Sequence, residues 1–240
     1  MIAGIFAVDK PLHMSSMRAV EIVRRRAERA RTGHAGTLDP LATGVLVLAL
    51  GRCTRMIESL MATEKRYETR IDLSAFTTTD DSEGERTEVR DAAPPQRHAI
   101  EALLRERFTG TIQQRPPAYS AVKLGGRRAY DLARKGLAPT PAPRPVQVHS
   151  IDVASYEWPH LDLRIHCGKG TYVRSIAREL GQQLGTGGTC LSIRRTMVGT
   201  FAIERAVPMD ALPERITQAW LCEHGDLPDA PPASAAACRQ

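Results

Sequence analysis

Apolar residues gather along this chain in short runs that predict β-strands. Residues 2–8 and 45–50 are nearly continuous apolar runs, and the second is typical of a strand buried on both faces. Residues 67–73 alternate between polar and apolar positions, as a half-buried strand does. Further strand patterns cover residues 146–156, 161–167 and 192–201. The sequence therefore predicts a sheet of several strands.

Helices are predicted between these strands. Ser15 or Ser16 can cap a helix that continues to about Arg31. Two more helical patterns cover residues 98–108 and 171–184. Strands and helices do not alternate strictly, and the sequence shows no internal repeat. We therefore expect a mixed α+β domain built on one large sheet.

The remaining segments are rich in residues that favour turns. Residues 113–128 carry many Pro, Gly and basic side chains, and they predict an extended, exposed loop that enters a helix near Tyr130. Residues 229–240 are low in complexity, and we expect them to be disordered. This pattern predicts one main domain at residues 1–208 and a short tail at residues 209–240.

Composition narrows the class of protein. The chain has 240 residues, of which 42% are hydrophobic and only 5% aromatic, so aliphatic side chains must form most of the core. No apolar run approaches the roughly 20 residues that a membrane-spanning helix needs. The first residues also lack the basic, apolar and small-residue order of a secretory signal. We therefore expect a cytoplasmic protein that does not enter a membrane.

The charged residues favour a polyanionic partner. The formal net charge is +6, and between Arg18 and Arg31 six arginines stand beside only two acids. Such a run is either a solvated helix face or a surface that binds phosphates, for which the planar guanidinium group is well suited. The five cysteines are far apart and form no CxxC pair, so the sequence predicts neither a zinc site nor a redox site.

One short segment concentrates residues that could carry chemistry. Residues 33–44 read GHAGTLDPLATG and combine one carboxylate, one imidazole, glycines and a proline. Pro40 favours extended backbone at Asp39, and the predicted buried strand at residues 45–50 follows closely. Asp39 is thus expected on a tight loop at the edge of a sheet, where catalytic residues are often found. An Asp before Pro is also a common turn residue, so position alone leaves both interpretations open.

A second polar cluster is GKGTYVR at residues 168–174. Glycines before a helix can bind an anion, although the spacing is not that of a Walker phosphate loop. The same residues also suit an ordinary strand-to-helix turn that Thr171 caps. Arg174 is expected in the first helical turn, where the helix dipole disfavours a cation. An acidic partner such as Asp39 would offset that cost.

Both segments resemble motifs of a known family. The run GHAGTLDPLATGVLVLALGRCTR, which begins at Gly33, closely resembles the catalytic signature of the TruB family of tRNA pseudouridine synthases. Four further stretches resemble that family's motifs in the same order: VDKP from Val8, KRYE from Lys65, PPAYSAVKLGGRRAYDLAR from Pro116 and GKGTYVRSIARELG from Gly168. The resemblance covers roughly residues 5–201. It implies a pseudouridine-synthase fold, with a large, mainly antiparallel mixed sheet flanked by helices and loops.

The resemblance implies a reaction and its catalyst. The Asp of the family's GTLDP motif is essential, and here it is Asp39. The family's reaction detaches uracil from its ribose, rotates it and rejoins it through carbon, usually at uridine-55 in the TΨC loop of tRNA. The carboxylate either adds covalently or abstracts a ribose proton, and the sequence leaves both routes open. The reaction needs no metal or cofactor, and we expect neither.

The resemblance also implies residues that bind the RNA. Tyr67 matches a tyrosine that stacks on the flipped base, a contact worth roughly 1–3 kcal/mol. Arg174 matches an arginine that pairs with the catalytic carboxylate. His34 matches a histidine that contacts the RNA loop. Tyr172 and Ile193 match two further substrate-contacting positions, the second of which is usually leucine. Phosphate contacts are expected from four basic residues of the loop region: Arg115, Lys123, Arg127 and Arg128.

The chain departs from the family pattern at two places. The turn after Lys10 and Pro11 usually contains a Gly and a Thr-Ser pair, but it reads LHMSS here. Only about thirty residues follow Leu212, too few for the C-terminal PUA-type RNA-binding domain that many members carry. Two alternatives to a tRNA synthase stay open. One is an RNA-binding module without turnover, against which the carboxylate of Asp39 argues because phosphates would repel it. The other is a synthase that acts on ribosomal RNA or within an RNA-guided complex.

Overall fold

The structure is a computed structural model that describes residues 2–90, 92–120, 122–133, 136–137 and 140–225. Of residues 123, 124 and 128 only the backbone is described. No helix within these ranges is long and apolar enough to cross a lipid bilayer. The predicted disordered stretch at residues 229–240 lies outside the described residues.

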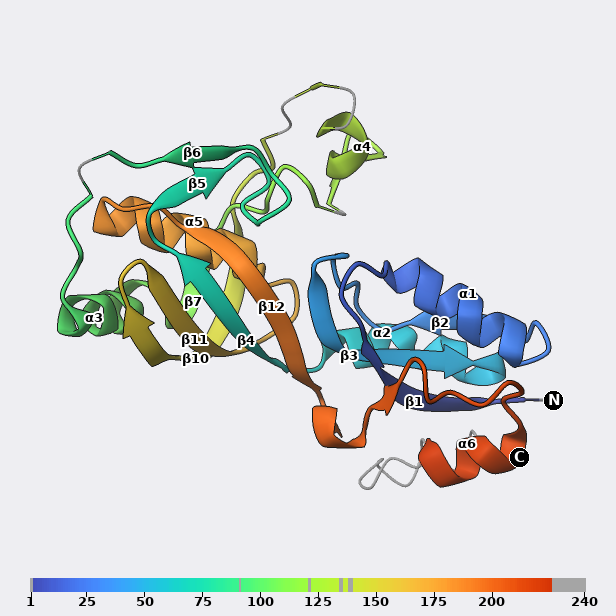
Figure 1. The fold of residues 1–240 in the computed structure, drawn as a ribbon. Coiled ribbons are helices and arrows are strands. Elements are labelled where there is room, and N and C mark those ends of the chain that lie inside the picture. Colours follow the sequence, from blue (N-terminus) through green and yellow to red (C-terminus); the bar gives the residue numbers. More distant parts are fainter. Residues whose placement is uncertain (1, 91, 121, 134–135, 138–139, 226–240) are drawn as a thin grey trace. The chain divides into compact units, whose positions relative to one another are not determined.

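One large sheet organises the described residues (Figure 1). Its ten strands in chain order are β1 (Gly4–Lys10), β2 (Thr32–His34), β3 (Ala42–Leu50), β4 (Lys65–Asp72), β7 (Gly110–Gln114), β10 (Arg144–Glu157), β11 (His160–Cys167), β12 (Thr189–Val198), β13 (Phe201–Ala202) and β14 (Val207–Pro208). Hydrogen bonds give the order β14-β1-β3-β12-β4-β11-β10-β7, while β2 also pairs with β3 and β13 with β12. The pair β1–β14 is parallel, and the pairs β1–β3, β2–β3, β7–β10, β10–β11 and β12–β13 are antiparallel. The predicted α+β fold with a mainly antiparallel sheet is confirmed.

Helices and two small hairpins complete the fold. The α-helices are α1 (Ser16–Arg26), α2 (Ile57–Ala62), α3 (Arg97–Arg107), α4 (Ala129–Ala133), α5 (Val173–Leu184) and α6 (Gln218–His224). The 3-10 helices are η1 (Gly51–Met56) and η2 (Ile203–Arg205). The hairpins pair β5 (Ala75–Thr77) with β6 (Arg86–Glu88), and β8 (Lys123–Leu124) with β9 (Arg127–Arg128).

The chain divides into two compact units. Unit 1 contains residues 1–67 and 194–240, and unit 2 contains residues 68–193. The two boundaries fall within β4 and β12, so each of these strands contributes residues to both units. The units are described separately below.

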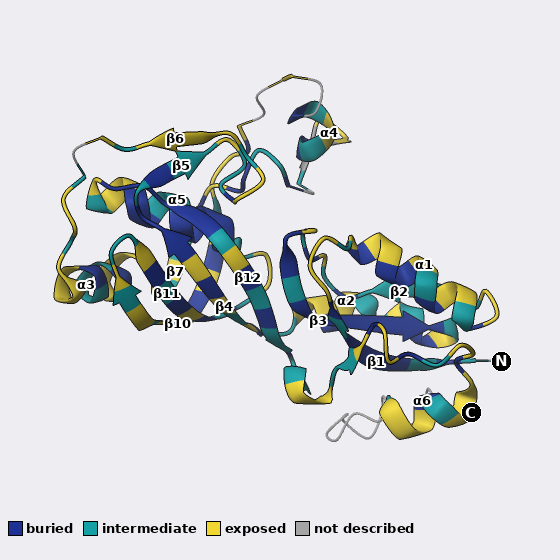
Figure 2. Cartoon of the chain, in the orientation of Figure 1, coloured by how far each residue is buried: buried dark blue, intermediate teal, exposed yellow. Residues whose placement is uncertain are grey.

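Unit 1 is built on β1 and β3. Every residue of β3 from Val45 to Leu50 is buried, as the continuous apolar run predicts (Figure 2). Helix α6 packs against β1, and the Gln218 side chain bonds both the N–H and the C=O of Ala3, just before β1, at 2.9 and 3.0 Å. The Trp220 ring meets Phe6 edge-on, with the ring centroids 5.2 Å apart. The weak pattern after Leu212 gave no signal for this helix.

Unit 2 is built on β10 and β11 together with α5. Helix α5 buries an apolar side that includes Ile176, Ala177 and Leu180. It ends at Gly185, which has a φ of 70° and supplies the left-handed C-cap that glycine favours. Helix α3 buries Ile100 and Leu104 and packs near β10.

Two predicted boundaries differ from the structure. Helix α1 ends at Arg26 rather than near Arg31, because Glu28 and Arg29 have φ angles of 52° and 61°, which a right-handed helix excludes. The predicted loop at residues 113–128 begins one residue before the end of β7 and contains the hairpin β8–β9. The helix expected near Tyr130 is α4.

Candidate active site

Asp39 lies in unit 1 on the loop between β2 and β3, and hydrogen bonds fix the residues on either side of it. The Ser16 hydroxyl of α1 accepts from the Leu38 N–H at 2.8 Å and donates to the Leu38 carbonyl at 2.9 Å. The His13 N–H donates to the Pro40 carbonyl at 2.8 Å. The Asp39 carbonyl accepts from the Ala42 N–H at 3.0 Å. The half-buried carboxylate thus stands on a loop that the start of α1 and the preceding turn hold in place.

Two buried cations of unit 1 belong to the same region. The Lys10 ammonium is fully buried and donates to the carbonyls of Pro11 and Met14 at 2.9 and 2.7 Å. Burial lowers the pKa of Lys10 to about 8, while the negative charge of Asp39 opposes the shift and Arg195 adds to it. The Arg195 guanidinium donates to the carbonyls of Val45 and Gly36 at 2.7 and 3.0 Å. It therefore ties the loop that carries Asp39 to strand β3.

Two glycines are needed for this arrangement. Gly36 and Gly44 both have a φ of 101°, a backbone conformation that side chains rarely permit. A Cβ atom on Gly44 would lie 2.2 Å from the Arg195 carbonyl oxygen. Glycine at position 44 therefore lets β12 approach β3 closely at the end next to Asp39.

His34 ends β2 in unit 1 and is partly buried. Its Nδ1 atom is buried and has no hydrogen-bond partner among the described residues. Burial lowers the pKa of His34, and the positive charge of Arg195 lowers it further. The neutral ring thus retains an unused hydrogen-bonding atom. Tyr67 is half-buried in β4 and is the last residue of the first segment of unit 1.

Arg174 lies in unit 2, in the first turn of α5, and is buried. Its Nη1 atom donates to Asp81 Oδ2 at 3.0 Å and to the Thr79 carbonyl at 2.9 Å. Its Nη2 atom donates to the Tyr119 carbonyl at 2.9 Å. The side chains of Arg174 and Asp81 are only 4% and 3% exposed, so this is a fully desolvated ion pair. Asp81 is thus an acidic partner of Arg174 within unit 2, and the expected pairing of Arg174 with Asp39 stays a prediction.

A second ion-pair group follows one turn along α5. Arg178 pairs with Asp80 and Glu179, and it also donates to the Arg115 carbonyl at 2.7 Å. Glu179 accepts from the Arg115 N–H at 3.2 Å. Burial raises the pKa of both Asp80 and Glu179, whereas Arg178 opposes the rise. The backbone of Arg115 is therefore clamped where the chain leaves β7, and its side chain is exposed.

Tyr172 and Ile193 also belong to unit 2. The buried Gln114 side chain bonds both the N–H and the C=O of Tyr172 at 2.7 and 3.0 Å. The Arg144 guanidinium lies 5.2 Å from the centroid of the Tyr172 ring, a cation–π arrangement. Ile193 is buried in β12. Both positions are therefore rigid within their unit.

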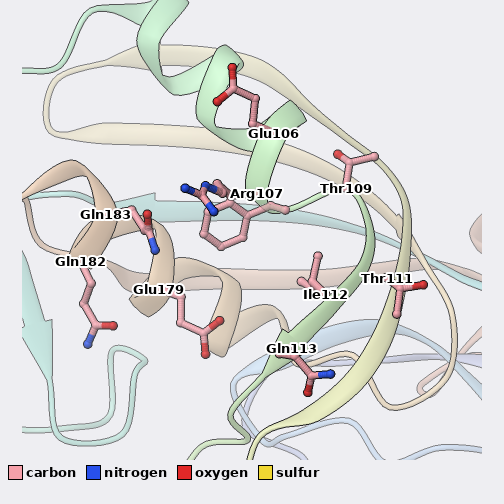
Figure 3. A pocket seen from close by; sticks show the side chains of 10 residues that line it. Glu106, Arg107, Thr109, Thr111, Ile112, Gln113, Glu179, Gln182 and Gln183 are labelled. Atoms are coloured by element: carbon pink, nitrogen blue, oxygen red, sulfur yellow. The ribbon is translucent and has the colours of Figure 1, made fainter.

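The basic residues of the predicted loop are described in part. Arg127 is exposed in β9. Lys123 and Arg128 lie in β8 and β9, and their side chains are outside the described part of the structure. A separate cavity of about 410 Å³ lies in unit 2, between the end of α3, β7 and α5. Figure 3 shows the side chains that line it. None of the site residues predicted from the sequence lines this cavity.

Several functional-site candidates were not predicted from the sequence. Asp81 lies in the polar turn at residues 77–84, and Arg195 lies in a predicted strand. The residues next to each of them in the sequence form no motif that would mark a functional site. Gln114 likewise lies in no motif that would distinguish it from other glutamines on strands. A charged or amide side chain on a strand or turn gives no sign of its partner when that partner is tens of residues away. The sequence does show two adjacent arginines, Arg194 and Arg195, inside a predicted strand. Because arginine is rarely buried without a partner, this pair could have indicated a functional or structural role.

Comparison with known proteins identifies the family. The family model described as TruB family pseudouridylate synthase (N terminal domain) matches residues 24–173, which is more than half of the chain. The protein belongs to the TruB family. Among curated TruB-family relatives, tRNA pseudouridine synthase B of Caulobacter sp. (strain K31) is 46% identical over 92% of this chain and 71% of its own length. The enzyme of the same name from Thermobifida fusca is 44% identical over 93% of this chain and 78% of its own length. The one from Bradyrhizobium diazoefficiens is 44% identical, and the chain spans 65% of it.

Solved structures support the same TruB-family fold. A crystal structure of a Cbf5-Nop10-Gar1 complex contains a chain that is 28% identical, with a TM-score of 0.67 over 86% of this chain. A structure of an H/ACA RNP bound to a substrate RNA containing 2'-deoxyuridine gives 25% identity and a TM-score of 0.64. This protein spans about half of each of those chains, 52% and 51%.

Proposed function

We propose that this TruB-family protein isomerises uridine-55 in the TΨC loop of tRNA to pseudouridine, with Asp39 as the catalytic carboxylate. The observation that carries the proposal is the fixed position of Asp39. Ser16 and His13 hold the residues on both sides of it, and Lys10 and Arg195 supply positive charge from the protein interior. The names of the curated relatives support the activity on tRNA.

The reaction is an isomerisation in which the bond from the ribose C1′ to the uracil N1 breaks and a bond from C1′ to C5 forms. The proton on C5 is lost and one proton is gained at N1, so no oxidant, reductant or water is consumed. A carboxylate can serve either as a nucleophile or as a base in this sequence. Asp39 fits both roles, because its loop leaves the carboxylate half-buried rather than enclosed.

The base must leave the RNA stack before its ring can rotate, which costs a few kcal/mol. We assign Tyr67 and Tyr172 as aromatic contacts and Ile193 as an apolar contact to the flipped uracil. Stacking on an aromatic face returns roughly 1–3 kcal/mol. His34 is assigned to the RNA loop next to the flipped base, and its partly exposed side chain in β2 is compatible with a contact there.

Arg174 is proposed to act on the charge of the reacting carboxylate, as the family resemblance implies. Its burial and its three contacts within unit 2 support a rigidly oriented guanidinium. The exposed Arg115 and Arg127, together with Lys123 and Arg128, are proposed to hold RNA phosphates. If they do, RNA affinity should fall steeply between low and physiological salt because bound counterions are released.

A positional pseudouridine assay tests the proposal. Unmodified tRNA transcript is incubated with the pure protein and mapped for pseudouridine. We expect a signal at uridine-55 that Asp39→Asn abolishes, while RNA affinity stays within about tenfold because the phosphate contacts remain. Asp162→Asn is the matched control, since Asp162 pairs with Arg70 on β4 and should leave the activity intact.

Three results would each contradict part of the proposal. An Asp39→Asn protein that still forms pseudouridine would refute the assignment of the catalyst. Tight binding of tRNA by the unsubstituted protein with no pseudouridine at any position would favour an RNA-binding module without turnover. Modification of ribosomal RNA but not of tRNA would keep the chemistry and refute the target.

A further inference from the structure

Helix α1 and the loop after it carry an exposed set of arginines whose role the proposed reaction does not explain. The buried side of α1 contains Ala19, Val20 and Val23, and the opposite side faces solvent (Figure 2). Besides Arg18, which pairs with Glu21, four exposed arginines lie on α1 or on the following loop, and we call them the arginine surface: Arg24, Arg25, Arg29 and Arg31. All four belong to unit 1.

The acids near this surface are already neutralised by other residues. Glu21 pairs with Arg18 at 3.4 Å, and Glu28 pairs with Arg215. Arg26 is directed elsewhere, because it donates to the Leu212 and Pro213 carbonyls at 2.6 and 3.3 Å. No ion pair of the arginine surface occurs among the described residues. Four positive charges therefore remain uncompensated within a short stretch, which favours a polyanion.

The loop that presents Arg29 is held in a strained conformation. Glu28 and Arg29 are consecutive non-glycine residues in the left-handed region, with φ angles of 52° and 61°. The Arg29 N–H donates to the Arg24 carbonyl at 2.8 Å, and the Ala30 N–H donates to the Ala27 carbonyl at 2.9 Å. Strain of this kind persists where the surrounding structure fixes it, and it is frequent at binding sites. Glycine at either position would relieve it.

The arginine surface lies at a defined distance from Asp39 within unit 1. Ser16, the first residue of α1, bonds Leu38 next to Asp39. Arg24 and Arg25 follow eight and nine residues later, which corresponds to about 12–14 Å along the helix axis. Arg31 is farther away, because its carbonyl accepts from the Gly51 N–H at 2.7 Å, just past the end of β3. Strand β3 starts next to Asp39 at Ala42 and extends about 26 Å.

We infer that the arginine surface binds phosphates of a helical RNA stem roughly 12–25 Å from the reacting nucleotide. The length of α1 would then set the distance between the bound stem and the loop nucleotide at Asp39. This inference rests on the proposed function, since it takes the RNA held at Asp39 as the partner. Arginine suits the role because its planar guanidinium binds phosphate oxygens in pairs. A distance of that size corresponds to roughly four or more nucleotides along one strand.

A length series of RNA hairpins tests the inference. The long hairpin has the TΨC loop on a stem of seven base pairs, and the short hairpin has the same loop on two cross-linked base pairs. For the long hairpin, Arg24→Ala with Arg25→Ala should weaken binding about tenfold and reduce the salt slope by about 1.5–2. For the short hairpin, which lacks the distant phosphates, the same variant should bind within about twofold of the unsubstituted protein.

The matched control is the charge-neutral pair of substitutions Arg18→Ala and Glu21→Ala on the same helix. It removes an arginine whose charge Glu21 already balances, and it should change neither affinity nor salt slope. Binding is measured by fluorescence anisotropy in the absence of turnover, using Asp39→Asn as the background. The readout therefore does not depend on whether pseudouridine forms.

Position 29 gives an independent test because strain and charge can be separated there. Arg29→Gly removes the guanidinium and relieves the left-handed backbone, so Tm should stay the same or rise while affinity for the long hairpin falls. Arg29→Ala removes the same charge and keeps the strain, so it should weaken binding equally with no gain in Tm. A purely structural role of Arg29 would move Tm and leave affinity unchanged.

If Arg24→Ala with Arg25→Ala lost the same affinity for the short and the long hairpin, the assignment of the arginine surface to distant stem phosphates would be wrong. If the variant lost no affinity for either hairpin, RNA would not be the partner of this surface. These outcomes differ from a failure of the proposed function. Absence of pseudouridine with a preserved length dependence would leave the arginine surface as an RNA contact of a non-catalytic binder.

Discussion

The buried ammonium of Lys10 provides a direct test of the charge arrangement below the loop that carries Asp39. Lys10 has no exposed surface, and it donates to the Pro11 and Met14 carbonyls. Burial lowers its pKa from 10.5 to about 8. A difference of that size between the unfolded and folded chain corresponds to about 3 kcal/mol in the free energy of unfolding.

The sign of the effect follows from which state binds the proton. Between about pH 8 and pH 10.5 the unfolded chain keeps a proton on Lys10 that the folded chain has lost. Because proton binding by Lys10 stabilises the unfolded state in this window, raising the pH weakens that stabilisation. The free energy of unfolding should therefore increase by about 3 kcal/mol. Lys10→Met binds no proton in either state and should lack this increase.

Urea unfolding followed by far-ultraviolet circular dichroism at several pH values from 7 to 10.5 measures the effect. The quantity of interest is the difference between the unsubstituted protein and Lys10→Met at each pH, since other groups titrate equally in both. Lys169→Met, which removes an exposed lysine, is the control and should follow the unsubstituted protein. Parallel curves for the unsubstituted protein and Lys10→Met would refute the reasoning.

Three further substitutions have expected effects on the free energy of unfolding, each measured by urea titration. Asp81→Ala removes the buried carboxylate that pairs with Arg174 within unit 2 and should cost about 3–5 kcal/mol, so a loss below about 1 kcal/mol would contradict the ion pair. His13→Gly relieves a φ of 62° and should stabilise the protein by about 0.5–1 kcal/mol, whereas a destabilised variant would show that the imidazole makes a compensating contact. Gly44→Ala places a Cβ atom 2.2 Å from the Arg195 carbonyl and should cost more than about 2 kcal/mol, and an unchanged stability would argue against this close approach.

Local patterns were sufficient for most of the secondary structure. The continuous apolar run at Val45–Leu50 could only be a strand buried on both faces or a buried helix segment, and its short length together with Gly44 and Gly51 favoured the strand that is observed. The amphipathic period of residues 171–184 predicted α5 to within two residues. These elements were predictable because their side chains repeat with the period of the structure they form.

Boundaries and docked elements were less predictable. The arginine-rich pattern continues past Arg26, yet α1 stops there because the chain must turn back into β2, and Glu28 and Arg29 adopt left-handed conformations to do so. Helix α6 has little pattern of its own. It is stabilised by the contacts of Gln218 with Ala3 and of Trp220 with Phe6 in β1, more than two hundred residues earlier in the chain.

The sequence by itself determined the family, the α+β class and the position of Asp39 on a constrained loop before a buried strand, because these depend on contiguous motifs and on local periodicity. Only the tertiary structure decided which residues surround those motifs. Arg195 reaches the Gly36 carbonyl across 159 positions, and Asp81 meets Arg174 across 93. Such pairings depend on which strands and turns become neighbours in the fold, and a side chain's own sequence neighbourhood carries no record of a partner so far along the chain.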